Sequence, residues 1–176
     1  RRSDMTEAAD QSPVTYGSYL AVDELLQLQR PQSQPEHPDE LLFIIVHQAS
    51  ELWFKAILHE LHLLIQNLKD ADTLLAFHTT RRVNTLSRIV AEQLHALDTL
   101  PPQRFAQFRG YLGSSSGGQS VQFRAIEALS GLREEHFLHA VREHGDVPPL
   151  VEEALTQPTL QSLFLDLLER RGTTLE

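Results

Sequence analysis

The sequence predicts an all-α fold, a helical bundle built on two long antiparallel helices. Apolar residues recur at intervals of three and four over long stretches, which is the spacing of one helical face. Only 8 glycines and 9 prolines occur among the 176 residues, and they fall between these stretches. No stretch alternates apolar and polar residues as a half-buried strand does. We therefore expect helices joined by short connections.

The chain is expected to consist of a disordered arm followed by one domain. Residues 1–14 are polar and predict a disordered arm, and residues 15–176 predict one domain. Residues 16–30 predict a short helix, which the prolines within residues 31–38 end. Its expected buried side consists of Tyr19, Leu20, Leu25 and Leu26.

The first long helix is predicted from Pro38 and Asp39 to Lys69, because proline and an acidic residue both suit a first turn. Its apolar residues form a wide stripe, so this helix should be central. The stripe is expected to contain Phe43, Val46, Trp53, Ile57, Leu61, Leu64 and Leu68, widened by Leu42, Ile45, Phe54, Leu58 and Ile65.

A second long helix is predicted over residues 71–100, and Pro101 and Pro102 end it and open a short helix that reaches residue 112. Residues 113–118, rich in serine and glycine, predict a loop. Further helices are expected near residues 119–129, 134–143 and 150–171, the last interrupted at Pro158. The core edge of the second long helix is expected at Val83, Leu86, Val90, Leu94 and Leu97.

Composition excludes several classes of function. Lys and Arg total 15 against 24 Asp and Glu, so the net charge of −9 disfavours nucleic acid and anionic membranes as partners. The absence of cysteine excludes disulfides, thiolate metal sites and a cysteine nucleophile. No apolar run approaches the ~18 residues of a membrane helix, and the first residues lack a signal peptide's apolar region. We expect a cytoplasmic protein.

Nine histidines raise the question of a metal site. No glutamate has a histidine three positions later, as a carboxylate-bridged di-iron bundle needs, and the sequence His59-Glu60-Leu61-His62 is not the zinc-protease spacing. His136 and His139 share a helical face, but such surface pairs are usually solvated. A histidine-based non-haem metal protein stays open as a less favoured alternative.

Two pairs at i, i+4 are the candidates for ligand binding. Phe43 lies one turn before His47, and Phe105 one turn before Arg109. An aromatic side chain next to a guanidinium suits a ligand with a flat ring and a carboxylate. Spacing alone favours structural roles, with His47 as a hydrogen-bonded core residue and Arg109 as a surface residue paired with an acid. The loop over residues 113–118 could offer hydroxyl and backbone N–H groups.

Four stretches of sequence resemble the tryptophan 2,3-dioxygenase family. They are Tyr16-Gly17-Ser18-Tyr19-Leu20, residues 37–55 (HPDELLFIIVHQASELWFK), residues 105–109 (FAQFR) and residues 119–127 (QSVQFRAIE), in the family's order. The resemblance implies an all-α, haem-dependent homotetramer that opens the indole ring of L-tryptophan with O2 to give N-formylkynurenine.

The resemblance also implies roles for single residues. His47 matches the distal histidine that faces the indole N–H, and Arg109 the arginine that takes the substrate carboxylate. Phe43 and Phe105 match residues lining the substrate ring, and we expect them to sandwich it. Ser116 matches the serine beside the haem, and we expect Gly117 and Trp53 to contribute to haem binding as well. Tyr16, Tyr19 and Leu20 match the segment that reaches a neighbouring subunit's pocket, in a tetramer or dimer.

Two departures from the family pattern leave alternatives open. Gly118 stands where the family has phenylalanine, which predicts a looser loop and a wider pocket, and would permit a haem-dependent aromatic hydroxylase or a dioxygenase of a modified tryptophan. The family's axial histidine lies downstream of the last residue here, so the iron ligand is unassigned. We expect a truncated chain, rather than a naturally short one or a substitute ligand. A non-catalytic helical module without haem is the alternative from another class.

Overall fold

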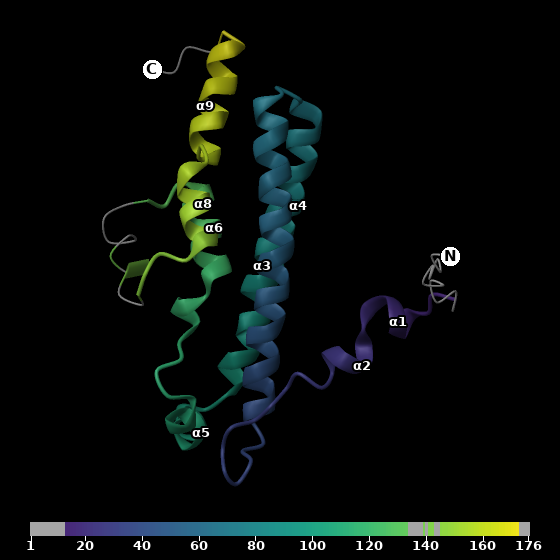
Figure 1. Ribbon diagram of the computed structural model, residues 1–176, viewed down its shortest axis with the longest axis vertical. Helices are drawn as coiled ribbons and strands as arrows, with labels where there is room; N and C mark the ends of the chain where they lie inside the picture. Colours follow the sequence, from purple (N-terminus) through teal and green to yellow (C-terminus); the bar gives the residue numbers. More distant parts are fainter. Residues whose placement is uncertain (1–12, 134–138, 140, 143–144, 173–176) are drawn as a thin grey trace, which may run out of the picture. The chain divides into compact units, whose positions relative to one another are not determined.

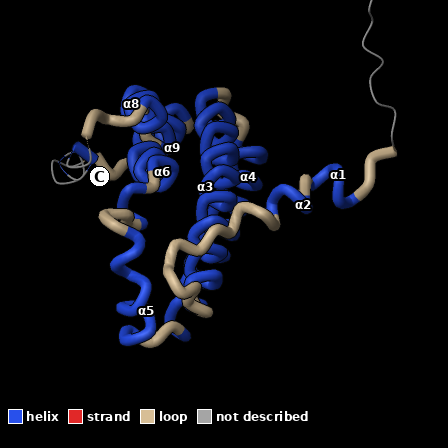
Figure 2. The backbone as a smooth tube through the Cα atoms, turned by 60° about the horizontal axis from the view of Figure 1, so that its bottom comes forward, coloured by secondary structure: helices blue, strands red, loops and turns tan. Residues whose placement is uncertain are grey.

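The structure is a computed structural model that describes residues 13–133, 139, 141–142 and 145–172 (Figure 1). The predicted arm before residue 13 and most of the predicted helix over residues 134–143 lie outside the described residues. Internal contacts divide the chain into two units, Arg1–Arg30 and Pro31–Glu176. Helices and loops make up the described part, and it contains no strand (Figure 2), so the all-α prediction is confirmed.

The first unit contains two short helices instead of the single one predicted. Helix α1 (Tyr16–Leu20) begins with Thr15, whose side chain accepts a hydrogen bond from the backbone N–H of Ser18. Ala21 then adopts a left-handed conformation with φ of 49°, which breaks the helix before α2 (Val22–Leu25). Neither helix buries a residue. The predicted buried side is therefore wrong: Tyr19, Leu20, Leu25 and Leu26 are all exposed.

The second unit is built on α3 (Glu40–Lys69) and α4 (Thr73–Leu94), which run side by side and are joined by three residues. The short connection makes them antiparallel, as predicted. Glu40 in the first turn and Lys69 in the last suit the helix dipole of α3. Asp72 caps α4 by accepting a hydrogen bond from the backbone N–H of Leu75 at 3.0 Å. The second helix ends earlier than predicted and continues as the 3-10 helix η1 (His95–Thr99).

The remaining helices follow the predicted order. They are α5 (Pro102–Arg109), η2 (Gly110–Leu112), η3 (Gly117–Gln119), α6 (Val121–Ser130), α8 (Pro149–Thr156) and α9 (Leu160–Arg170). Ser120 and Thr159 cap α6 and α9 with their side chains, and Pro102 and Pro149 occupy the first positions of α5 and α8. The break predicted at Pro158 separates α8 from α9.

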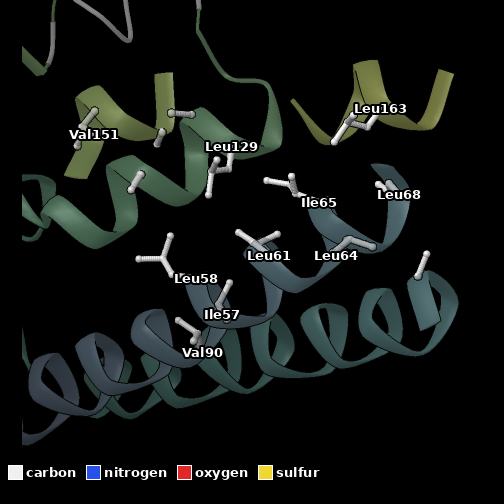
Figure 3. Close-up of a cluster of buried hydrophobic side chains, with 14 of the residues drawn as sticks. Ile57, Leu58, Leu61, Leu64, Ile65, Leu68, Val90, Leu129, Val151 and Leu163 are labelled. Atoms are coloured by element: carbon white, nitrogen blue, oxygen red, sulfur yellow. The ribbon is translucent and has the colours of Figure 1, made fainter. Parts of the chain in front are cut away.

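The hydrophobic core lies between α3 and the helices that surround it. Figure 3 shows Leu58, Leu61 and Ile65 of α3 facing Leu129 of α6, with Val90 of α4 on the other side. The predicted stripe is confirmed where it is deepest, since Ile57, Leu61, Leu64 and Leu68 are buried. Ile45 and Leu94, which were assigned to the core, are 45% and 43% exposed, because no described helix covers those faces.

Helix α3 is the one described helix long and apolar enough, by length and composition, to cross a membrane, with a mean hydropathy of 1.5 over its most apolar window. In this fold its apolar face contacts α4, α6 and α9. Of the residues in that window, 22% are buried inside the fold.

Candidate functional site

Four aromatic side chains from α3 and α5 form a cluster, the ring cluster, that contains Phe43, His47, Phe105 and Phe108. The ring centroids of Phe43 and His47 are 4.2 Å apart, which confirms the contact predicted from their i, i+4 spacing. Phe43 lies 5.4 Å from Phe105 across the two helices. These distances are typical of paired aromatic rings. The two candidate pairs of the sequence analysis therefore meet through Phe43 and Phe105.

The Phe43 and Phe105 rings contact each other, and we call this pair the aromatic wall; a ligand sandwiched between them would require the rings to move apart, so the sandwich stays a prediction. Two carbon surfaces in contact need about 3.5–4.0 Å, so a flat ring between two others needs roughly 7 Å between their centroids. The observed 5.4 Å, with the planes tilted by 32°, leaves no room for a third ring between them. A flat ligand can lie against the wall instead.

Phe108 is the member of the cluster that sequence reasoning missed. It is fully buried and meets Phe105 edge-on, with centroids 5.3 Å apart and planes at 89°. Its ring is also 5.7 Å from that of Phe43. The signal was available, because Phe105 and Phe108 are at i, i+3 on one predicted helix and so share a face.

The imidazole of His47 is oriented by the backbone of its own helix. Its Nδ1 lies 2.7 Å from the carbonyl oxygen of Phe43. Because a carbonyl oxygen only accepts, Nδ1 carries the hydrogen, and in the neutral ring Nε2 has a free lone pair. A Cβ built on Gly117 would lie 3.9 Å from that Nε2, so the acceptor atom faces the glycine of the loop.

Arg109 is held by the loop that follows it. Its Nη1 donates to the carbonyl of Gly113 at 2.7 Å, and its Nη2 to that of Ser115 at 3.3 Å. Gly113 has φ of +57° and ψ of −134°, a conformation that favours glycine, and this turns its carbonyl toward the guanidinium. No carboxylate of the described residues pairs with Arg109, so the surface ion pair that spacing favoured is not formed. Its positive charge remains available to an anionic ligand.

The loop itself has a defined hydrogen-bonded structure. The side chain of Ser116 accepts from the backbone N–H of Gly118 at 3.2 Å, and the side chain of Gln119 accepts from the backbone N–H of Ser116 at 3.0 Å. Arg124 of α6 donates to the carbonyl of Gly118 through Nε and Nη2. The looser loop expected from Gly118 is therefore not what the structure describes. A Cβ at Gly118 would lie 3.4 Å from Arg124 Nη2, which is an ordinary van der Waals contact.

Two charged groups fasten the start of α3 next to the ring cluster. Glu40 is fully buried and accepts hydrogen bonds from the backbone N–H groups of Gln32 and Ser33, at 2.7 and 3.0 Å, and from the Ser33 hydroxyl. Burial raises the pKa of Glu40, but these donors stabilise the carboxylate more and hold its pKa below the usual range. The hydrogen bond and charge of Arg104 likewise lower the pKa of Asp39.

The other predicted site residues lie away from the ring cluster or in the first unit. Trp53 is half-buried and packs against the hydrophobic core, so its assignment to a cofactor stays a prediction. Tyr16 and Tyr19 of α1 are 79% and 78% exposed, and Leu20 is 45% exposed. Their contact with a neighbouring subunit also stays a prediction.

Other hollows and histidines in the described part do not form a comparable site. A surface hollow of about 370 Å³ is lined by His78, Arg81, Arg82 and Thr85, all from one exposed stretch of α4. It shares no residue with the ring cluster. Among the described residues, no three His, Asp or Glu side chains come together as metal ligands would.

The comparisons with known proteins agree with the resemblance seen in the sequence. The family model described as tryptophan 2,3-dioxygenase matches residues 3–170. The chain is similar to proteins named tryptophan 2,3-dioxygenase from Kineococcus radiotolerans (44% identity over 90% of this chain), Anaeromyxobacter sp. strain K (42% over 94%) and Herpetosiphon aurantiacus (44% over 90%). It spans 56%, 62% and 61% of their respective lengths.

Proposed function

The chain belongs to the tryptophan 2,3-dioxygenase family, and from that premise we propose that it carries the substrate side of a haem-dependent dioxygenase. The proposed reaction opens the indole ring of L-tryptophan with O2 and gives N-formylkynurenine. The observation that supports it best is that two neighbouring helices provide an aromatic wall, an imidazole whose Nδ1 is bonded to a backbone carbonyl, and an arginine that no carboxylate of the described residues pairs with.

The aromatic wall and His47 suit the indole ring. Phe43 and Phe105 offer apolar rings in contact with each other, against which a flat bicyclic ring would gain dispersion contacts. The indole N–H is a donor, and it loses free energy if it is buried without an acceptor. His47 Nε2 supplies that acceptor, because the carbonyl of Phe43 keeps the hydrogen on Nδ1. The same lone pair could hold the indole proton during the reaction.

Arg109 suits the carboxylate of an amino acid. The carbonyls of Gly113 and Ser115 fix its guanidinium with one N–H of each Nη, and the remaining N–H donors can bind a carboxylate. These carbonyls orient the group but do not neutralise its charge. A substrate carboxylate would therefore meet a preoriented cation and would lose little side-chain entropy on binding.

The loop is the part of this chain that fits a haem. Gly117 presents backbone without a side chain toward His47 Nε2, and a Cβ there would occupy the space between the loop and the imidazole. Ser116 at the start of η3 would add a hydroxyl on the same side. Haem supplies the activation of O2 when bound. Ser116 and Gly117 would hold its edge, and no residue of this chain is assigned as the axial ligand.

We include in the proposal a cytoplasmic homo-oligomer, a tetramer or a dimer. Its support is the exposure of Tyr16, Tyr19 and Leu20 on α1, since exposed large side chains gathered on one short helix are available for a neighbouring subunit. The net charge of −9 supports a small-molecule substrate and disfavours nucleic acid or an anionic membrane.

The test is the binding of L-tryptophan and of tryptamine, which lacks the carboxylate, to the hemin-supplied protein and to its Arg109→Ala variant. We expect the variant to lose about 2–5 kcal/mol of affinity for L-tryptophan, because the desolvated carboxylate loses its partner. Tryptamine affinity should change much less. Equal losses for the two ligands, or no loss for L-tryptophan, would remove Arg109 from the site.

A further inference from the structure

Helix α5, which carries Phe105 and Arg109, is held in place by the ring contacts of Phe105 and Phe108 and by polar side chains. It has 8 residues and buries only Phe108. Among the described helices it packs extensively only against η2, which continues it. A short helix without a broad apolar interface has few contacts that fix its position. The polar contacts of α5 therefore act together with the ring contacts in setting where Phe105 and Arg109 lie.

Two of these contacts are single hydrogen bonds to the segment before α3. His37 Nε2 lies 3.0 Å from Gln107 Oε1, and since Nδ1 accepts from the backbone N–H of Asp39 at 3.2 Å, Nε2 is the donor in the neutral ring. The hydroxyl of Tyr111, in η2, donates to the carbonyl of Gln34 at 2.8 Å. A single hydrogen bond fixes a distance more than an orientation, and the His37 ring adds a contact with that of Phe108, with centroids 5.1 Å apart.

The third contact is a two-point ion pair. Arg104 donates to Asp39 through Nε and Nη2, the latter at 2.9 Å from Oδ1. The planar guanidinium fixes orientation as well as distance when it binds a carboxylate at two points. Asp39 is the N-cap residue of α3, where an aspartate usually caps its own helix, yet its side chain makes no capping hydrogen bond. Its carboxylate binds the other helix instead.

The ion pair adjoins the ring cluster at both of its ends. Arg104 immediately precedes Phe105, and Asp39 lies one turn before Phe43, whose backbone N–H donates to the Asp39 carbonyl at 3.2 Å. The rings of Phe43 and Phe105 are in contact, with their centroids 5.4 Å apart. A rotation of α5 that breaks the ion pair would move Phe105 and Arg109 together, relative to Phe43 and His47.

We propose that the Arg104–Asp39 ion pair is a positioning device for amino acid binding, which sets Phe105 and Arg109 of α5 against Phe43 and His47 of α3. This inference rests on the proposed function, because it concerns the same site. Neither Arg104 nor Asp39 needs to touch the ligand. We expect about a tenfold loss of L-tryptophan affinity, because the ring contacts, His37 and Tyr111 still hold α5.

The experiment is a double-mutant cycle on L-tryptophan affinity. Calorimetry on the hemin-supplied protein gives the Kd of L-tryptophan for wild type, Arg104→Ala, Asp39→Ala and the double variant, with tryptamine as the second ligand. Each single variant should bind L-tryptophan about tenfold more weakly, and the double variant no more weakly than the singles, since one contact is lost in all three. The loss should be larger for L-tryptophan than for tryptamine, because Arg109 moves with α5.

Two further variants separate positioning from stability. Arg104→Lys keeps the charge but cannot bind at two points, so it should weaken L-tryptophan binding while its melting temperature stays near that of wild type. Arg88→Ala, an exposed arginine of α4, is the matched control and should bind within about twofold of wild type. Arg104→Lys also keeps the test decisive if an alanine variant fails to fold.

The outcomes separate this inference from the function on which it rests. Wild-type protein that binds no L-tryptophan would overturn the proposed function, and the positioning role with it. Wild-type binding that the Arg104 and Asp39 variants all retain within about twofold would overturn the positioning role alone. Losses that multiply in the double variant, or that are equal for L-tryptophan and tryptamine, would also overturn it.

Discussion

Replacement of Glu40 by glutamine should destabilise the second unit measurably. Glu40 is fully buried, and its two carboxylate oxygens accept from three donors on Gln32 and Ser33. A glutamine has only one acceptor oxygen. This oxygen would face Ser33, which provides two donors and is 6% exposed. The amide nitrogen of the glutamine would then face the backbone N–H of Gln32. One charge-assisted hydrogen bond is lost and one donor loses its acceptor, which corresponds to about 1.5–3 kcal/mol.

Urea unfolding followed by circular dichroism measures this change. Glu40→Ala removes the acceptor for all three donors and should cost more, about 3–5 kcal/mol. Glu36→Gln, an exposed glutamate of the same segment, is the control and should stay within about 0.5 kcal/mol of wild type. An unfolding free energy for Glu40→Gln that matches the control would refute the view that this carboxylate fastens the segment to α3.

Two other predictions concern pH and the core. The folded-state pKa values of Asp39 and Glu40 lie below their usual range. Both carboxylates therefore stabilise the fold fully above the unfolded-state pKa values, which are near 4. This stabilisation is lost as the pH falls through the folded-state pKa values. Unfolding free energy measured from about pH 6 down to about pH 3 should therefore fall, and it should fall less steeply in Glu40→Gln; equal slopes would contradict this. Leu61 is 1% exposed, and Leu61→Ala should lower the free energy of unfolding by about 2–5 kcal/mol. Leu63 is 43% exposed, and Leu63→Ala should lower it by under about 1 kcal/mol. Equal losses in thermal or urea unfolding would show that the core lies elsewhere.

Helix α3 could be predicted from the sequence because its apolar spacing is a property of one continuous segment. The same reasoning failed over residues 16–30, where Leu20 and Leu25 were assigned to one helix. The left-handed conformation of Ala21 breaks that helix, and alanine gives no sequence signal for such a conformation. Ile45 was assigned to the core because it is apolar, although no described helix covers it.

The site could be predicted only where its members share a helix. The contact between Phe43 and His47 follows from helical geometry. The contact between Phe43 and Phe105 joins segments far apart in the sequence, so no spacing rule contains it. The intramolecular partners of Arg109 could not be predicted for the same reason. Spacing suggested an acid on the surface, but the loop turns back at Gly113 and presents carbonyl oxygens to the guanidinium.

Mass spectrometry of the product formed from L-tryptophan in oxygen-18 gas tests the central claim most directly. The protein that contains this chain, loaded with haem and kept ferrous by a reductant, should form N-formylkynurenine with both atoms of one O2 incorporated. Formation should fall strongly in Arg109→Ala and stay near wild type in the control Arg88→Ala. A product that keeps the indole ring and carries one labelled oxygen would identify a hydroxylase, and would contradict the proposed dioxygenase reaction.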